Sequence, residues 1–223
     1  MTFVPGPYQR QSALPIQLSA LLVVEGRDAF EFVLALLTEL GLNNQIEVRD
    51  GGGVAKRATG DFEKYLRLLP TISGFDKVTS LGIMRDAETD PTQAFQDVCK
   101  ALQHAALPVP NAALQATQKT TPTVTVMILP DAATPGMLET LCWRALGGDP
   151  RLPCVDEFLK CIEKETGQPV ARPDKSRVYA YIAVREEPQF LLGLAARAKY
   201  FPWTATAFDE IRTFVQNIIK AVP

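Results

Sequence analysis

Acidic residues follow three apolar runs of the sequence. They are Glu25 after residues 18–24, Asp86 and Glu88 after residues 77–84, and Asp131 after residues 123–129. Short apolar runs of this kind are typical of buried parallel strands. Carboxylates at one edge of a sheet repel one another unless a cation lies between them. Carboxylate oxygens are ligands that suit Mg²⁺ or Mn²⁺, so the spacing predicts a divalent cation site.

Strands and helices are expected to alternate along the first part of the chain. The predicted strands are 18–24, 46–48, 77–84 and 123–129, and the predicted helices between them are 28–40, 61–69 and 91–106. Five further helices are expected at 136–146, 155–166, 174–185, 189–200 and 205–221, although residues 179–184 also fit a strand. Alternation favours βαβ units with right-handed crossovers. The fold class is therefore α/β, with a mostly parallel four-stranded sheet flanked by helices and a C-terminal helical extension.

The same pattern suggests three parts of the chain. Residues 1–17 contain three prolines and no clear period, which is typical of an irregular arm. Residues 18–146 hold the predicted α/β core, and residues 147–223 form a helical extension that we expect to pack on it. Within the core, the Pro-, Thr- and Gln-rich residues 107–122 are expected to form a loop. Asp28 is expected to cap the first helix.

The composition limits the partners that the protein can attract. The chain has 223 residues, of which 47% are hydrophobic, with 23 basic and 25 acidic side chains. Such a chain can bury a core, which excludes a disordered protein. Its net charge of −2 gives no overall attraction to nucleic acid or membranes, so phosphate binding needs a local patch or bound cations. No run spans a bilayer and the start does not resemble a signal peptide, so we expect a cytoplasmic protein.

Two further charged residues have alternative interpretations. Glu139 follows Gly136 in the first turn of a predicted helix, where the helix dipole alone would favour a carboxylate. Lys175 belongs to the basic run 172–177 and either lies in solvent or neutralises charge that develops on a phosphoryl group. Gly51, Gly52 and Gly53 follow the second strand. They indicate a tight turn with positive φ, or a close approach of a nucleic-acid backbone helped by Lys56 and Arg57.

The four cysteines do not form a recognisable metal motif. No CxxC pair occurs, and the single histidine, His104, has no close ligand partner, which disfavours a zinc site. Cys99 and Cys142 are expected to lie on buried helix faces as small apolar residues. Cys154 and Cys161 are seven residues apart, so they are expected to share a helix face.

The motifs resemble those of Toprim domains, the α/β catalytic module of topoisomerases, primases and the overcoming-lysogenization-defect nucleases. The marks of that module are a strand that ends in Glu-Gly, here Glu25-Gly26, and a later strand that ends in Asp-x-acid, here Asp86-Ala87-Glu88. The chain is also similar to a family of small stand-alone Toprim-like proteins. The shared features are VEGxD at 24–28, IxRDA at 83–87, LP…GxLExLC at 129–142 and CxxxxxxC at 154–161.

The resemblance implies cation-dependent phosphodiester chemistry on nucleic acid. It implies that Glu25, Asp86 and Glu88 hold Mg²⁺ or Mn²⁺ and that Asp28 and Glu139 support a second cation. Lys175 would stabilise the transition state. The second acid of the Asp-x-acid motif is Glu88 where the family pattern has Asp. The extra methylene changes its reach toward a cation.

Three functions stay open on the sequence, so whether the protein is an enzyme is undecided. The first is a metal-dependent nuclease, and the second is a non-catalytic interaction or regulatory subunit derived from a Toprim domain. The third is a domain that binds a nucleotide or phosphorylated metabolite in a closed pocket. The sequence contains no phosphate-binding P-loop, so an ATPase partner would have to act in trans. The sequence also leaves open whether the C-terminal helices pack on the sheet or form the surface of a homodimer.

Overall fold

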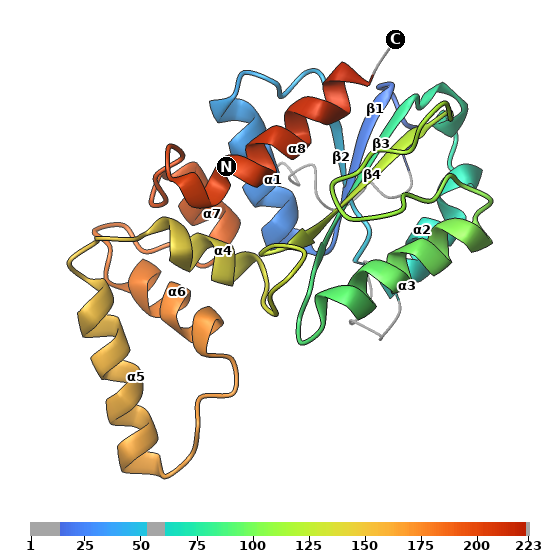
Figure 1. Ribbon diagram of the computed structural model, residues 1–223. Helices are drawn as coiled ribbons and strands as arrows, with labels where there is room; N and C mark the ends of the chain where they lie inside the picture. Colours follow the sequence, from blue (N-terminus) through green and yellow to red (C-terminus); the bar gives the residue numbers. More distant parts are fainter. Residues whose placement is uncertain (1–13, 53–60, 222–223) are drawn as a thin grey trace.

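A parallel sheet is the centre of the computed structural model, which describes residues 14–52 and 61–221 (Figure 1). Its strands are β1 (Ala20–Val24), β2 (Glu47–Asp50), β3 (Ser80–Asp86) and β4 (Thr123–Leu129). The strand order is β2-β1-β3-β4, and every neighbouring pair is parallel. The α/β fold class is therefore confirmed. The N-terminal arm up to residue 13, and Gly53, Lys56 and Arg57, lie outside the described residues.

Helices occupy most of the predicted positions. In chain order they are α1 (Arg27–Glu39), α2 (Asp61–Leu68), α3 (Pro91–His104), α4 (Leu138–Ala145), α5 (Leu152–Thr166), α6 (Pro173–Ala183), α7 (Leu192–Arg197) and α8 (Asp209–Lys220). Short 3₁₀ turns lie at Leu69–Thr71, Phe75–Lys77 and Thr206–Phe208. Residues 179–184 were open to a strand interpretation, but they lie in and just after α6.

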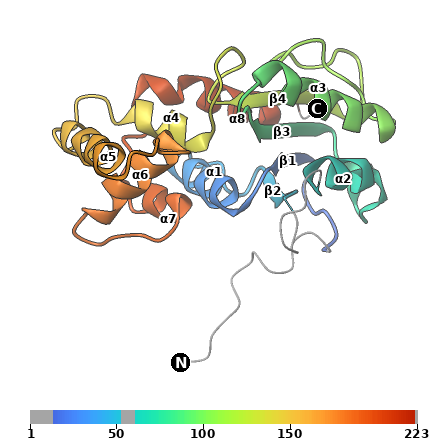
Figure 2. The same ribbon diagram turned by 90° about the horizontal axis from the view of Figure 1, so that it is seen from below.

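Both faces of the sheet are covered by helices (Figure 2). Alternate residues of a strand point to opposite faces. Leu21 and Val23 therefore pack with α2 and α3, whereas Leu22 and Val24 pack with the residues of α1 and α8. Because both sides are buried, β1, β4 and most of β3 are apolar, which is why the apolar runs identified them. The edge strand β2, with the sequence EVRD, is not apolar.

The loop after α3 protects the open edge of the sheet. Leu114 donates its backbone N–H to Val126 O at 2.7 Å, and Thr117 donates to Val124 O at 2.9 Å. These bonds occupy backbone groups of β4 that would otherwise be free to pair with another strand. The prediction of a loop over residues 107–122 is confirmed.

The start of α1 differs from the prediction. Gly26 is the N-cap residue, with φ +90°, and Asp28 lies in the first helical turn. The prediction that Asp28 caps this helix was therefore wrong. The side chain of Asp28 is engaged by more distant parts of the chain, which local sequence does not reveal.

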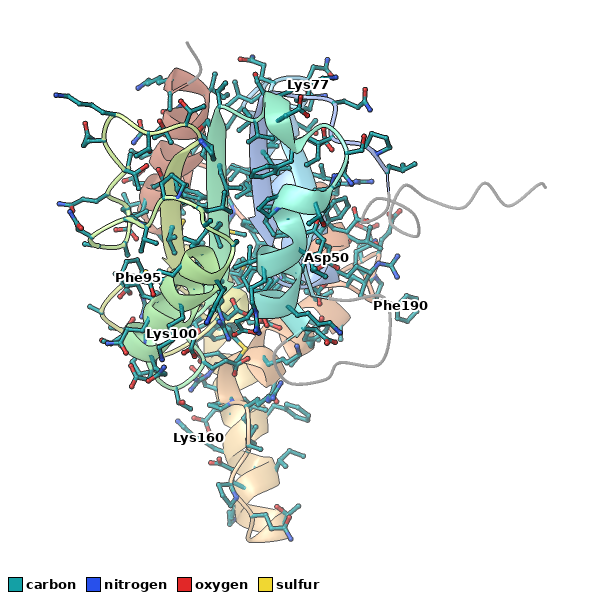
Figure 3. All side chains as sticks on the ribbon, turned by 90° about the vertical axis from the view of Figure 1, so that its right-hand side faces the viewer. Asp50, Lys77, Phe95, Lys100, Lys160 and Phe190 are labelled. Carbon is teal, nitrogen blue, oxygen red and sulfur yellow. The ribbon has the colours of Figure 1, made fainter. Side chains whose placement is uncertain are left out.

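The C-terminal helices differ in how closely they lie to the sheet. Helix α8 lies on β1, β3 and β4, and α7 lies against α1. Helices α5 and α6 pack on each other, and α5 extends away from the rest of the molecule (Figures 1 and 3). Among the described residues, the helices are all too short or too polar to span a bilayer.

Gly193 sets how closely α7 approaches α1. A Cβ atom at this position would lie 2.3 Å from Glu31 Cβ and 2.8 Å from the Phe32 backbone nitrogen. Real Cβ contacts are not this short, and the backbone of α1 cannot move aside without disturbing the core. The sequence therefore needs glycine here, although glycine is a poor helix former.

We predict that Gly193→Ala destabilises the protein by about 1–3 kcal/mol, the usual cost of overpacking, despite the higher helix propensity of alanine. Urea denaturation followed by circular dichroism measures this change. Gly147→Ala is the matched control, since its new Cβ would meet Arg144 O at an ordinary 3.5 Å. The control is expected to stay within about 0.5 kcal/mol of the wild type. Equal stability of the two variants would contradict the close approach.

Candidate functional site

A cavity of about 330 Å³ lies at the carboxyl edge of the sheet, beside the ends of β1 and β3. All six residues predicted for the site line it: Glu25, Asp28, Asp86, Glu88, Glu139 and Lys175. The other charged side chains of its wall are Arg27, Asp61, Glu63, Arg85 and Arg172. The cavity wall is therefore dominated by charged groups from at least five elements of the fold.

The turn after β1 is fixed by the last residue of β2. Asp50 Oδ1 accepts the backbone N–H of Gly26 at 2.8 Å and that of Gly52 at 2.7 Å. Gly26 has a φ of +90°, a conformation that residues other than glycine rarely adopt. These constraints explain the Glu-Gly pair, because they direct the chain into α1 directly after Glu25.

The two glycines after β2 were expected to need positive φ. Neither Gly51 nor Gly52 has it. Their need for glycine comes from space: a Cβ on Gly52 would lie 2.8 Å from the Gly26 nitrogen, and one on Gly51 would lie 2.9 Å from the Tyr65 ring. The interpretation that Gly51 and Gly52 form a tight turn with positive φ was therefore wrong.

Arg85 holds two carboxylates on one side of the cavity. Its guanidinium lies 3.4 Å from Glu25 and 2.5 Å from Glu63, measured from nitrogen to oxygen. Burial raises the pKa of Glu25, Arg85 partly offsets this, and the nearby Glu63 and Glu88 raise it further. The sequence analysis quoted Arg85 within a motif without giving it a role. The neighbouring Asp86 was the signal that could have drawn attention to it.

Asp86 is the last residue of β3 and lies among the other acids. Its Oδ1 accepts the backbone N–H of Leu138 at 2.9 Å, at the start of α4. Burial raises the pKa of Asp86 well above its ordinary value, and the negative charges of Glu139, Glu25 and Glu88 add to the effect. The hydrogen bond from Leu138 lowers this pKa but does not cancel the increase. Keeping Asp86 ionised therefore needs a positive charge nearby.

Glu88 is held by the backbone and not by a regular strand. Its N–H and C=O each bond to Gly136 at 2.8 Å, which joins the loop after β3 to the loop after β4. Its φ of +52° is unusual for a residue with a side chain and costs about 1 kcal/mol or more. The strand ends at Asp86, so the strand geometry that predicted a common face for Asp86 and Glu88 does not extend to Glu88.

Glu139 and Lys175 form an ion pair at 2.9 Å between α4 and α6. The glutamate side chain is 5% exposed and the lysine side chain is 34% exposed. Glu139 lies in the first turn of α4, as predicted from the sequence. A carboxylate that is almost fully buried needs a charged partner, and Lys175 provides it. Because Lys175 belongs to α6, this ion pair connects the C-terminal helices to the cavity.

Asp28 is engaged by residues from α6 and α7. Tyr179 donates its hydroxyl to Asp28 Oδ2 at 2.9 Å, and the Gly193 N–H lies 3.4 Å from Oδ1. Burial and the charge of Asp28 raise the pKa of Tyr179, so the hydroxyl keeps its proton. The sequence analysis missed Tyr179. It follows Lys175 by four residues on one helix face, and the Lys175 Nζ lies 5.8 Å from the centre of its ring.

Asp131, the acid after β4, does not line this cavity. It accepts hydrogen bonds from the Ala133 and Thr134 backbones and pairs with Arg144 at 2.7 Å. Burial raises its pKa, but these hydrogen bonds outweigh that effect and lower the pKa overall. The expectation that acids after three strands gather at one site therefore holds for β1 and β3 but not for β4.

The acids around the cavity are close enough to raise one another's pKa, but their side chains do not converge on one position where a metal ion could bind. Within the part of the chain that the structure describes, no group of three or more His, Cys, Asp or Glu side chains is near enough to hold a metal ion. Glu25 and Glu139 are each drawn toward a cationic side chain. The donors are carboxylate oxygens, which suit a hard divalent cation, so the residues fit such an ion in their chemistry.

None of the four cysteines lines the cavity. Cys142 is buried, as predicted, whereas Cys99 is half-buried. Cys154 and Cys161 are both exposed on α5, and none of the four is in a disulfide.

The fold and cavity define an α/β protein whose carboxylate-rich cavity lies at the carboxyl edge of a parallel sheet. A family model described as "Protein of unknown function (DUF3226)" matches residues 19–220, so the chain belongs to the DUF3226 family. No curated protein matches the sequence. Two solved structures of the C-terminal region of the OLD protein of Xanthomonas campestris pv. campestris are similar at 16% identity. The matches cover 92% of this chain and 95% and 96% of theirs, with TM-scores of 0.41 and 0.43.

The raised pKa of Asp86 predicts how stability depends on pH without added metal. Between the ordinary pKa of aspartate, 3.8, and the raised value, the folded state binds more protons than the unfolded state. The free energy of unfolding therefore falls as pH rises through this window, by up to about 1.4 kcal/mol per pH unit. Asp86→Asn keeps an oxygen for the Leu138 N–H and is expected to flatten this dependence and stabilise the protein at pH 7.

Urea denaturation in EDTA between pH 4 and pH 8 measures this effect. Asp131→Asn is the contrasting control: because the pKa of Asp131 is lowered, its contribution to stability is already complete above the ordinary pKa of aspartate. This variant is expected to lower stability between pH 4 and pH 8 without changing its dependence on pH. Some dependence on pH is expected to remain in Asp86→Asn, because the pKa of Glu25 is also raised. Parallel pH profiles for the wild type and Asp86→Asn would contradict the assignment.

Proposed function

We propose that the cavity binds Mg²⁺ or Mn²⁺ and that the protein hydrolyses phosphodiester bonds of nucleic acid there. The observation that carries this proposal is the buried position of Asp86 among Glu139, Glu25 and Glu88, where burial and then these charges raise its pKa. A bound divalent cation would relieve this repulsion. The resemblance of the Glu-Gly and Asp-x-acid motifs to those of Toprim domains supports the same chemistry.

Glu25, Asp86 and Glu88 would hold one cation, and Asp28 and Glu139 would support a second. When bound, such ions supply an activated water and stabilise charge on the leaving oxygen. Asp50 orients the Glu25 turn through its bond to Gly26. In the cation-free protein, Arg85 pairs with Glu25 and Lys175 pairs with Glu139, so two of these acids have a cationic partner before a metal ion binds.

Lys175 is the residue suited to meet the substrate. Its side chain is 34% exposed at the cavity wall, and Arg172 lies one turn earlier on the same wall. With Glu139 engaged by a cation, the Lys175 ammonium would be available to the substrate, where it would stabilise negative charge that develops on the phosphoryl oxygens.

Metal binding is the first test. Calorimetry with Mn²⁺ and with Mg²⁺ is expected to show binding to the wild type that is lost in Asp86→Ala. A nuclease assay on the same samples should show cleavage reduced by at least ~100-fold, since even residues outside the ligand shell commonly cost 10–100-fold. The control is Glu186→Gln, an exposed acid outside the cavity wall, which is expected to bind and cleave like the wild type. An absence of wild-type binding at millimolar metal would reject the proposal.

Substitution of Lys175 separates metal binding from catalysis. Lys175→Gln is expected to keep or strengthen metal affinity, because Glu139 loses its cationic partner. Cleavage is expected to fall by about 10²–10³-fold, because charge on the phosphoryl group is no longer neutralised. Lys100→Gln, which changes an exposed lysine on α3, is the matched control. Loss of metal binding together with cleavage in Lys175→Gln would show that Lys175 acts only in the structure of the site.

One observation favours a second candidate, a non-catalytic regulatory or interaction subunit. Arg85 already pairs with Glu25 and Glu63, so the acids on that side have a cation built into the chain. A partner ATPase acting in trans fits this role. Co-purification of an ATPase from the native cell, with no metal binding by the isolated protein, would favour this candidate over the nuclease.

A further inference from the structure

Helix α5 carries an exposed strip of apolar and sulfur-containing side chains. Phe158 is 54% exposed and Ile162 is 41% exposed, and Cys154 and Cys161 are also exposed. These four residues follow a spacing of three and four, which brings them onto one face of a helix. We call them the α5 strip. Large apolar side chains that share an exposed face commonly mark a surface that binds another protein.

The partner helix α6 covers a different side of α5. Val155 and Leu159 are buried, at 5% and 8% exposure, on the side of α5 that packs in the core. The α5 strip lies next to this buried side and remains outside it. Figure 3 shows α5 extending from the rest of the molecule, with Lys160 pointing into solvent. A second molecule can therefore reach the strip without first displacing the sheet or its helices.

The charges beside the strip are arranged in a self-complementary way. Glu157 and Lys164 are seven residues, or two helical turns, apart, so they lie along the same edge of the strip. Their side chains are 72% and 84% exposed. If two copies of α5 lie antiparallel about a two-fold axis near residue 160, Glu157 of each copy faces Lys164 of the other. In the same arrangement, Cys161 of each copy lies within about one residue of the two-fold axis and therefore next to Cys161 of the other copy.

We propose that α5 is a homodimer surface, on which two copies of the chain pair their α5 strips in an antiparallel arrangement. Symmetry requires that each contact occur twice, which the Glu157 and Lys164 pattern satisfies. In a parallel arrangement, Glu157 would instead lie level with Glu157 of the other copy, and Lys164 level with Lys164, so opposite charges would not face each other. The proposal concerns assembly alone and is independent of the chemistry of the cavity.

The size of the surface sets the expected affinity. Fifteen residues of helix span about 22 Å, so one helix pair buries less than the ~800 Å² per partner of a standard interface. A dissociation constant on the order of 10 µM is therefore expected, measured by sedimentation equilibrium over a range of protein concentrations. A wild type that stays monomeric well above this concentration would overturn the proposal.

Charge reversal tests the arrangement without changing the apolar contacts. Glu157→Lys and Lys164→Glu are each expected to weaken dimerisation by about 10-fold, because two attractive pairs become repulsive. The double variant, Glu157→Lys with Lys164→Glu, is expected to recover to within about 3-fold of the wild type. Lys100→Glu is the matched control: it makes the same change in charge as Lys164→Glu, but at an exposed lysine on α3, outside α5. Failure of the double variant to recover would overturn the antiparallel pairing.

One further variant and a disulfide cross-link test the strip itself. Phe158→Asp is expected to abolish dimerisation while far-UV circular dichroism stays unchanged, because the side chain is half-exposed in the monomer. Under mild oxidation, Cys161 of one copy is expected to form a disulfide with Cys161 of the other copy, because both lie within about one residue of the two-fold axis. Dimerisation that survives Phe158→Asp, or a disulfide that joins Cys154 to Cys154, would overturn the proposal.

Discussion

Repulsion between carboxylates at the carboxyl edge of the sheet is the constraint on which the site depends. Burial raises the pKa of Asp86, and the negative charges of Glu139, Glu25 and Glu88 add to the effect. Cationic side chains pair with two of the surrounding acids: Arg85, also on β3, pairs with Glu25, and Lys175 on α6 pairs with Glu139. Most other features of the site can be understood as ways of holding these charges in position.

The strand order makes this arrangement possible. Because β1 lies between β2 and β3, the ends of three strands meet at one edge and bring Glu25, Asp50 and Asp86 together. The strand order alone does not complete the wall. Lys175 and Tyr179 come from α6, and the Gly193 N–H comes from α7, so the C-terminal helices reach back to acids of the N-terminal half.

The sequence predicted the strands, most helices and the six candidate residues, since buried strands and amphipathic helices leave periodic patterns. It failed where distant contacts decide the outcome. Asp28 was expected to cap its helix, but Tyr179 engages it from 151 residues away. Asp131 follows its strand as the other acids do, yet local hydrogen bonds and Arg144 hold it elsewhere. Gly51 and Gly52 are required by neighbouring atoms and not by their own φ.

The sequence by itself determined the α/β fold class and which acids end β1 and β3, because hydrophobic periodicity and strand termini are local properties. Only the tertiary structure decided which charges pair. Arg85 joins Glu25 to Glu63, and Lys175 pairs with Glu139 across two helices. An ion pair depends on distances of a few ångströms between side chains that are far apart in sequence. Those distances are set by how the helices pack on the sheet, which no local pattern records.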